Sequence, residues 1–437
     1  MEPIDLNTAI QKSVFLLGAG ASYGTKKTRT GCKMSGEMFD ALQNLLNKPE
    51  KNEITDVEAE AFRFLISTLH YQNNWRSLEK NSKFEFKPNI EELALVIRRI
   101  KNRENYLPYP ITGNWADKLI QLESKFNSEN NDADSLFESL ENKLKRKLLL
   151  SWLQINPDSL SYLEPLAQLM SAQSLESPIE CFSLNYDQTI EIFLKNKHEV
   201  HPYCGFVSGE WKGPKTKDIE GFDRLNLYKL HGSLDWVRLM DSGTIKIREN
   251  LQDEEEKDID QRHDPYLIFG HGLKTFSFEP FSSLMYHFKE SLSKRPYIFA
   301  IGYSFFDPYI NNLIIEALNY NEFSKLIIVN PVFGPEDIKD DESRVLSEYI
   351  EEIQKNTFYS EMPEFNMQKI KGTDRIRYIN VGFDTFLSEH FLNNGKGLID
   401  LINEYEINNL KSQHSKFIVI NLTLAIKDNA RNQPHRI

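Results

Sequence analysis

A short apolar segment that runs into a glycine-rich turn constrains the fold of this chain more than any other feature. Residues 12–24 read K-S-V-F-L-L-G-A-G-A-S-Y-G, and residues 13–17 have the profile of a buried strand. Glycines at a strand-to-helix turn permit positive φ angles and let a phosphate approach the backbone amides. Doubly wound sheets hold a pyrophosphate in this way. The spacing is not G-x-G-x-x-G, however, so a tight turn without a ligand is the alternative.

The rest of the chain predicts a parallel sheet. Six apolar segments have strand character, and helical segments follow several of them. These segments are residues 13–17, 179–184, 225–230, 297–301, 325–329 and 376–381. Alternation of this kind is typical of a parallel sheet with helices on both faces. We therefore predict an α/β fold with a parallel sheet of about six strands and a large helical insertion.

The segment between the first two predicted strands is mostly helical in pattern. Residues 89–100 give the clearest helix, because Asn89 can cap it, Glu92 follows three residues later and apolar residues line one face. We expect this insertion at about 50–175 and expect it to cover part of the site.

A second insertion, expected at about 200–290, combines loops with a hairpin. Residues 201–221 carry glycines and prolines and look like loop. The hairpin is predicted at 236–248 around an Asp-Ser-Gly turn, and a short strand is predicted at 266–269. Farther along the chain we expect a helix at 342–355.

The composition of the chain indicates in which cellular compartment it functions and which partners it does not bind. The 437 residues carry a net charge of -12, so no strong direct binding to nucleic acid is expected. The three cysteines are far apart and form no C-x-x-C motif, which argues against a disulfide framework and a cysteine-based zinc site. The N-terminus does not resemble a signal peptide, and no apolar run approaches about 18 residues. We expect a cytoplasmic protein without a membrane span.

Small and polar residues occupy the carboxyl ends of five of the six predicted strands. Ligands bind at this edge of an open parallel sheet, so the residues there are the candidate site. They are Gly18, Ala19, Gly20 and Ser22 after the first strand, Asn185 and Asp187 after the second, His231 after the third, Gly302 and Ser304 after the fourth, and Asn330 after the fifth.

Several of these residues also have an ordinary structural explanation. Asn185 could be a left-handed turn residue, and Asp187 could be a helix N-cap. His231 could be a partly buried histidine with satisfied hydrogen bonds, and Ser304 could cap the next helix together with Asp307. A metal site is a poor interpretation, because no H-x-x-x-H pair occurs. A serine hydrolase is equally poor, because there is no G-x-S-x-G motif.

Taken together, six short motifs resemble the sirtuin family in their order. They are G-A-G-A-S at 18–22, L-N-Y-D at 184–187, K-L-H-G at 229–232, F-G at 269–270, G-Y-S at 302–304 and V-N at 329–330. The resemblance implies a Rossmann-like, NAD-binding catalytic domain at 1–395. The remaining residues, 396–437, are expected to be a C-terminal tail and a possible interaction element.

The resemblance also implies roles for the candidate residues. Gly18, Ala19, Gly20 and Ser22 would contact the pyrophosphate side of NAD. Asn185 and Asp187 would face the nicotinamide ribose, and His231 would be the catalytic base. Gly302, Ser304 and Asn330 would complete the cofactor site, with Ser304 and Asn330 holding the phosphate and the adenosine ribose.

Two departures from the sirtuin deacetylases narrow the resemblance. No cysteine follows Cys204, so the four-cysteine zinc ribbon is missing and no zinc is expected. Residues 25–35 also replace the I-P-D-F-R type segment. Without these two features, the sequence is similar to the sirtuin-like NAD hydrolases of bacterial antiphage defence, most of all to the HerA-associated type. That similarity implies a homo-oligomer and a HerA-type ATPase partner, with an Argonaute-type partner as the alternative.

The expected activity is therefore NAD hydrolysis, with NAD as the substrate. Cleavage of the nicotinamide–ribose bond would give nicotinamide and ADP-ribose and deplete NAD during abortive infection. Asn185 would position the attacking water and His231 would accept a proton. Two alternatives stay open: a non-catalytic sensor that binds NAD or ADP-ribose, and an NAD-dependent protein deacylase.

Overall fold

The computed structural model describes most of the chain. The described residues are 4–25, 28–47, 54–80, 88–102, 114–130, 135–215, 224–248, 259, 265–269, 278–305, 307–331 and 375–407. The helix predicted at 342–355 lies outside these ranges, and so does Gly270 of the F-G motif.

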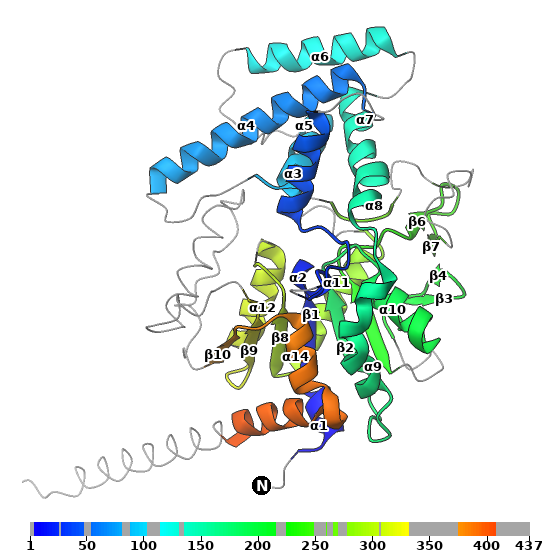
Figure 1. The fold of residues 1–437 in the computed structure, drawn as a ribbon, viewed down its shortest axis with the longest axis vertical. Coiled ribbons are helices and arrows are strands. Elements are labelled where there is room, and N and C mark those ends of the chain that lie inside the picture. Colours follow the sequence, from blue (N-terminus) through cyan, green and yellow to red (C-terminus); the bar gives the residue numbers. More distant parts are fainter. Residues whose placement is uncertain are drawn as a thin grey trace, which may run out of the picture.

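A six-stranded parallel sheet forms the centre of the molecule (Figure 1). Its strands are β1 (Ser13–Leu17), β2 (Ile179–Ser183), β5 (Leu225–Lys229), β8 (Tyr297–Ile301), β9 (Lys325–Val329) and β10 (Ile376–Ile379). They are arranged in the order β10-β9-β8-β1-β2-β5, and every neighbouring pair is parallel. The predicted α/β, Rossmann-like fold is confirmed, and the six strands lie where the apolar segments predict them.

Helices cover both faces of this sheet, which is why its inner strands are apolar at successive positions. Phe15 and Leu17 of β1 belong to one core, whereas Val14 and Leu16 belong to the other. The first core is closed by α1 (Leu6–Gln11), η3 (Pro157–Leu163), α9 (Glu164–Met170), α10 (Thr189–His198) and α14 (Phe383–His390). The second core is closed by α11 (Phe281–Lys294) and α12 (Pro308–Tyr320).

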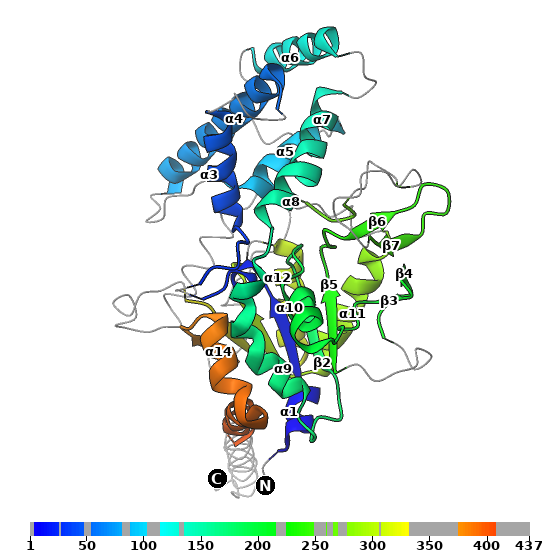
Figure 2. The same ribbon diagram turned by 45° about the vertical axis from the view of Figure 1, so that its right-hand side comes forward.

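A layer of helices stands at the carboxyl-terminal end of the strands, in both ribbon views (Figures 1 and 2). It contains α3 (Ser35–Leu46), α4 (Asp56–Lys80), α5 (Ile90–Lys101), α6 (Trp115–Glu129), α7 (Leu136–Asn142), the π-helix η2 (Lys143–Leu148) and α8 (Leu149–Trp152). These helices share a third apolar core. The prediction placed the insertion at about 50–175; α3 precedes that range, and η3 and α9 within it pack on the sheet instead.

The cap predicted for α5 is present. The Asn89 side chain accepts a hydrogen bond from the Glu92 backbone, and the Glu92 side chain accepts one from the Asn89 backbone. This capping box fixes where α5 begins and hence where its first turn points.

Two predictions in the second insertion are wrong. Residues 201–221 were expected to be loop, but β3 (Phe206–Val207) and β4 (Glu210–Trp211) form a hairpin there, because Ser208 and Gly209 adopt the positive φ angles of a tight turn. It extends the predicted hairpin of β6 (Trp236–Arg238) and β7 (Ile245–Ile247) into a small antiparallel sheet. The strand expected at 266–269 is reduced to one bridge between Leu267 and Gly232.

The chain returns to the sheet after α14. Residues 392–407 are helical, and Leu398 and Ile402 are buried in the core that contains β1. The Tyr405 ring stacks on Tyr297 with 5.8 Å between ring centroids. The predicted tail at 396–437 thus begins within a helix that packs on the sheet.

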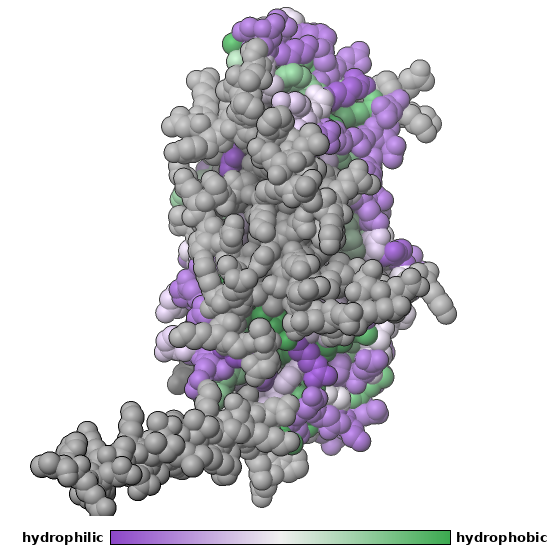
Figure 3. All heavy atoms as spheres, turned by 90° about the vertical axis from the view of Figure 1, so that its left-hand side faces the viewer, coloured by the Kyte–Doolittle hydropathy of each residue, from purple (hydrophilic) through white to green (hydrophobic). Residues whose placement is uncertain are grey.

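The surface agrees with the charged composition of the chain. In the face shown in Figure 3, the described residues are largely hydrophilic and the hydrophobic ones form small groups. Within the described ranges, no helix combines the length and the apolar character needed to cross a membrane.

Candidate functional site

The glycine turn after β1 lies where the strand order reverses. The chain continues from β1 to β2 on one side and later returns to β8 on the other side. Two backbone hydrogen bonds join the loops after β1 and β8: Gly18 N donates to Ile301 O at 2.9 Å, and Gly20 N donates to Gly302 O at 3.0 Å. In open α/β sheets, this reversal point is where ligands bind.

The three predicted site glycines at this point are required by close packing. A Cβ atom on Gly18 would lie 2.5 Å from Gly302 O, and one on Gly20 would lie 2.8 Å from Gly302 Cα. The positive φ expected for glycines of the turn is wrong for Gly18, whose φ is -102°. Of these three glycines, Gly302 is the one that needs this freedom, with φ of +60°. The turn is glycine-rich because two backbones touch here.

A cavity opens beside the turn, between the strand ends and the helical layer. It contains about 890 Å³ of empty space, including space open to solvent. The predicted residues that line it are Gly18, Ala19, Ser22, Asn185, Asp187, His231 and Ser304. Gly20 and Gly302 lie in the packed contact behind it. Asn330 is not among the lining residues, and its Nδ2 instead donates to Tyr303 O at 3.4 Å.

Asn185 is held by the glycine turn. Its Nδ2 donates to Gly18 O at 2.8 Å and to Ser22 Oγ at 2.9 Å, and the residue is 9% exposed. Both amide hydrogens are used in these bonds, so Oδ1 is the side-chain atom that can accept a hydrogen bond from a ligand. The Asn185 carbonyl oxygen therefore has one fixed orientation at the cavity wall.

His231 lies beside the carboxylate of Asp307, a residue that was predicted only to cap the next helix together with Ser304. Its Nε2 is 3.1 Å from Asp307 Oδ2, and both side chains line the cavity. The two atoms are not aligned for a hydrogen bond, and Nε2 is buried without a partner among the described residues. The alternative of a histidine with satisfied hydrogen bonds is therefore wrong at this nitrogen.

Asp187 combines a local and a site position. Its Oδ1 accepts hydrogen bonds from the backbone N–H of Thr189, at 3.0 Å, and from the Thr189 hydroxyl, so it contacts the first residue of α10. The N-cap of α10 is Gln188, so the alternative that Asp187 is the N-cap is wrong; Asp187 precedes the cap and also lines the cavity.

A buried lysine fastens the loops after β2 and β5. Lys229 Nζ donates to Asp187 O, to Glu191 Oε1 at 2.9 Å and to Ser233 Oγ at 3.0 Å. Burial opposes the charge of this ammonium, but the carboxylates of Glu191 and Asp235 outweigh that effect and raise the pKa of Lys229. The loops that carry Asp187 and His231 are therefore tied to one internal cation.

The helical layer adds residues that the sequence analysis missed. Lys33, Met38 and Glu91 are among the residues that line the cavity from this layer and the loop before it. Burial raises the pKa of the Tyr186 hydroxyl, and the nearby Glu91 carboxylate contributes to that rise. The cap at Asn89 predicts where α5 begins, but no sequence signal places that end against the sheet.

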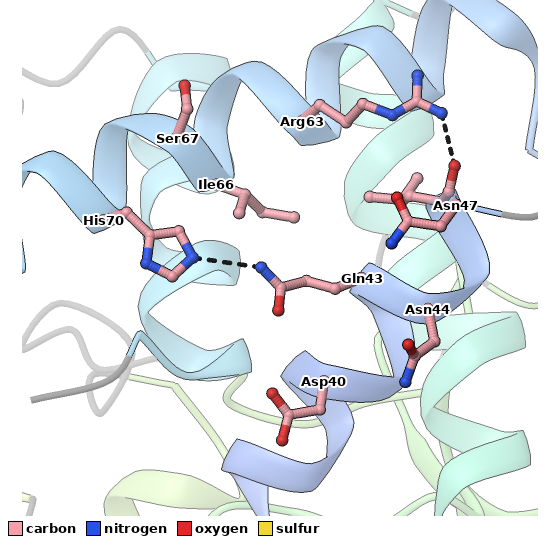
Figure 4. A pocket seen from close by; sticks show the side chains of 9 residues that line it. Asp40, Gln43, Asn44, Asn47, Arg63, Ile66, Ser67 and His70 are labelled. Carbon is pink, nitrogen blue, oxygen red and sulfur yellow. Dashed lines mark hydrogen bonds between the residues drawn. The ribbon is translucent and has the colours of Figure 1, made fainter.

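A second groove lies within the helical layer, between α3 and α4 (Figure 4). Its empty space is about 1020 Å³, and the Gln43 and His70 Nε2 atoms are 3.2 Å apart across it. Arg63 donates to Leu46 O at 2.5 Å. No predicted site residue lines this groove, and most of its polar side chains are exposed. The cavity at the strand ends is therefore the candidate site.

The described residues contain no group of three or more His, Cys, Asp or Glu side chains that could hold a metal ion. The three cysteines are free, and Cys32 and Cys181 are buried.

Comparison with protein families gives one match. Residues 180–353 match the family model of a SIR2-like domain. The match contains Asn185, His231, Gly302 and Asn330 and begins after the glycine turn. A search of curated proteins found no match. The family match supports a sirtuin-like family, and because SIR2-like domains use NAD, it is consistent with an NAD-related activity.

Proposed function

We propose that this protein is an NAD glycohydrolase that cleaves the bond between nicotinamide and ribose. The observation that carries the proposal is the convergence of Asn185, His231 and the glycine turn on one cavity. The family match at 180–353 supports NAD as the substrate.

The residues around the cavity fit such a substrate. Gly18 has no side chain, so a pyrophosphate could approach its backbone closely. Lys33 adds a positive charge that would attract the pyrophosphate. Glu91 and Asp187 also line the cavity, and their carboxylates would stabilise the positive charge that develops on a ribose bound there.

The proposed chemistry needs few protein groups. Nicotinamide leaves as a neutral molecule, and the ribose passes through an oxocarbenium-like transition state, as in glycoside hydrolysis. A water oxygen forms a bond to the ribose carbon as the bond to the nicotinamide nitrogen breaks. Asn185 Oδ1 accepts a hydrogen bond from this water, and His231 takes its proton and passes it to solvent. The products are nicotinamide, ADP-ribose and one proton.

The test is direct measurement of nicotinamide and ADP-ribose after incubation of the purified protein with NAD. His231→Ala and Asn185→Ala should each lower turnover by about 10²–10⁴-fold, the usual contribution of a positioned acid–base group. His198→Ala is the matched control, because His198 lies at the end of α10 and pairs with Glu164. A folded His231→Ala variant that consumes NAD at the parent rate would contradict the proposal.

The same samples separate the two alternatives. A non-catalytic sensor would bind NAD or ADP-ribose without releasing nicotinamide. A deacylase would release nicotinamide only together with removal of an acyl group from lysine, so an acylated peptide is included in a parallel reaction.

We also propose that the activity depletes NAD in antiphage defence, in a homo-oligomer that works with a HerA-type ATPase. The support is the resemblance of the six motifs to the sirtuin family, together with the missing zinc ribbon and the different segment at 25–35, which make the chain more similar to sirtuin-like defence enzymes than to the deacetylases. An Argonaute-type protein is the alternative partner. Native mass measurement, with and without the ATPase, tests the assembly. NAD levels in infected cells that carry the parent or His231→Ala protein test the role.

A further inference from the structure

The two carboxylate oxygens of Asp307 face different partners. Oδ1 accepts hydrogen bonds from the backbone N–H groups of Tyr309, at 2.8 Å, and Ile310, at 3.1 Å, and so caps α12. Oδ2 lies 3.1 Å from His231 Nε2. Asp307 is 6% exposed and His231 is 8% exposed. The helix cap thus fixes the carboxylate in place and leaves its second oxygen toward the imidazole.

The loop that carries Asp307 is itself braced. The Tyr303 hydroxyl contacts Asp307 O at 3.1 Å and Asn311 Oδ1 at 2.8 Å. Asn311 Nδ2 donates to Phe305 O at 2.7 Å, and Phe305 itself has a positive φ of +59°. These bonds hold the Asp307 carboxylate against movement away from His231.

His231 Nε2 is a buried nitrogen without a hydrogen-bond partner in the described part of the chain. Such a group is costly, and a proton on Nε2 that faces the carboxylate would remove the cost with a small rotation of the ring. The other tautomer would place a nitrogen lone pair against a negative charge. Catalytic hydrogen bonds often tighten in this way only when substrate binds.

We propose that Asp307 is a positioning residue that holds His231 in the tautomer with its proton on Nε2. The Nδ1 lone pair is then the atom that accepts a proton in the cavity. This role rests on the proposed NAD hydrolysis for its effect on turnover, but the tautomer is a property of the protein alone.

Asp307→Asn is the sharpest test, because the helix cap fixes how the new amide is oriented. Its oxygen continues to cap α12, since Asn is as good a cap as Asp, and its NH₂ group faces His231 Nε2. That nitrogen must then accept, which moves the imidazole proton to Nδ1. The corresponding change in serine proteases lowers kcat by about 10⁴-fold through the wrong tautomer, so we expect a loss of about 10²–10⁴-fold here.

Nitrogen NMR of protein labelled at histidine reads the tautomer without any substrate. The His231 signal is assigned by its absence in His231→Gln. We expect Nε2–H in the parent protein and Nδ1–H in Asp307→Asn. Asp5→Asn is the matched control, because Asp5 caps α1 through Thr8 N at 2.7 Å and no predicted site residue takes part in that cap; it should leave both the His231 signal and turnover unchanged.

The outcomes separate the two proposals. An unchanged tautomer in a folded Asp307→Asn variant would overturn the role of Asp307, whatever the activity. If the parent protein releases no nicotinamide, the proposed function fails while the NMR result still decides this inference. Should Asp307→Asn fail to fold, Asp307→Ser keeps a capping oxygen and removes the carboxylate, and His231 should then lose its fixed Nε2–H tautomer.

Discussion

Gly18 and Gly302 approach each other so closely that a Cβ atom on Gly18 would lie 2.5 Å from the Gly302 carbonyl oxygen. The contact joins the loops after β1 and β8 at the point where the sheet reverses its strand order. Both glycines were predicted as ligand-binding residues. Their first physical requirement is this backbone contact, which brings the walls of the cavity together.

Gly302→Ala should therefore destabilise the protein by about 1–3 kcal/mol or more. The new Cβ would meet Ala21 N at 2.5 Å, and φ of +60° is unfavourable for alanine. Urea unfolding of the purified variant measures the change. Gly36→Ala is the control, because Gly36 has no atom within 4 Å of a new Cβ and lies in α3, so it should be neutral or slightly stabilising. Equal stability of the two variants would contradict the packing argument.

Asn185→Asp should impair both stability and turnover. The carboxylate cannot donate to Gly18 O or Ser22 Oγ, and it would place a negative charge 2.8 Å from a carbonyl oxygen. We expect a loss of about 1–3 kcal/mol in unfolding free energy, and loss of nicotinamide release. Asn127→Asp, on the exposed face of α6, is the control and should change neither quantity. Parent-like values for Asn185→Asp would show that these bonds do not hold the loop.

Lys229→Met should destabilise the fold by up to about 3–5 kcal/mol, because it leaves the partly buried Glu191 carboxylate without its cation. Adding Glu191→Leu should restore part of the loss, since the uncompensated charge is then removed. Lys195→Met, at an exposed position of α10, serves as the control. Urea unfolding of the single and double variants measures the coupling, and strictly additive losses would contradict it.

Glu180 should make stability depend on pH in the acidic range. Burial opposes its ionisation, but the His287 hydrogen bond at 2.7 Å and the Arg295 charge lower the pKa of Glu180 from 4.5 to about 2. A lowered pKa contributes stability above pH 4.5 that disappears as the pH falls toward 2, by about 3 kcal/mol in total.

Unfolding free energies of the parent protein and Glu180→Gln, measured from pH 3 to pH 7, check this prediction. The difference between them should be largest near neutral pH and shrink as the solution becomes more acidic. Exposed Glu129→Gln should stay close to the parent at every pH. A difference that does not vary with pH would mean that the carboxylate is not specifically stabilised.

Sequence patterns predicted the sheet because burial on two faces leaves a local trace. Five strands of the parallel sheet, β1, β2, β5, β8 and β9, are each an uninterrupted buried run of five residues. Such apolar runs, separated by segments with helical periodicity, can be recognised without knowing which strands lie beside them. The small hairpin of β3 and β4 was missed because its strands are two residues long and only half-buried or exposed.

The residues of the candidate site likewise fall into those that the sequence could predict and those that it could not. Asn185, Asp187 and His231 could be found because they directly follow strands, and parallel strands end at one edge. Glu91 and Lys33 could not be found, because only the packing of the helical layer brings them to the cavity.

The sequence by itself determined an α/β sheet and the set of residues at its carboxyl edge, since both follow from interactions between residues near in the chain. Only the tertiary structure decided which of these residues meet. Gly18 touches Gly302, and Asp307 faces His231, because β1 lies beside β8 and because the cap of α12 aims one carboxylate oxygen across the site. Strand order depends on how apolar surfaces that are distant in the chain pack together, so the local periodicity of the sequence cannot predict it.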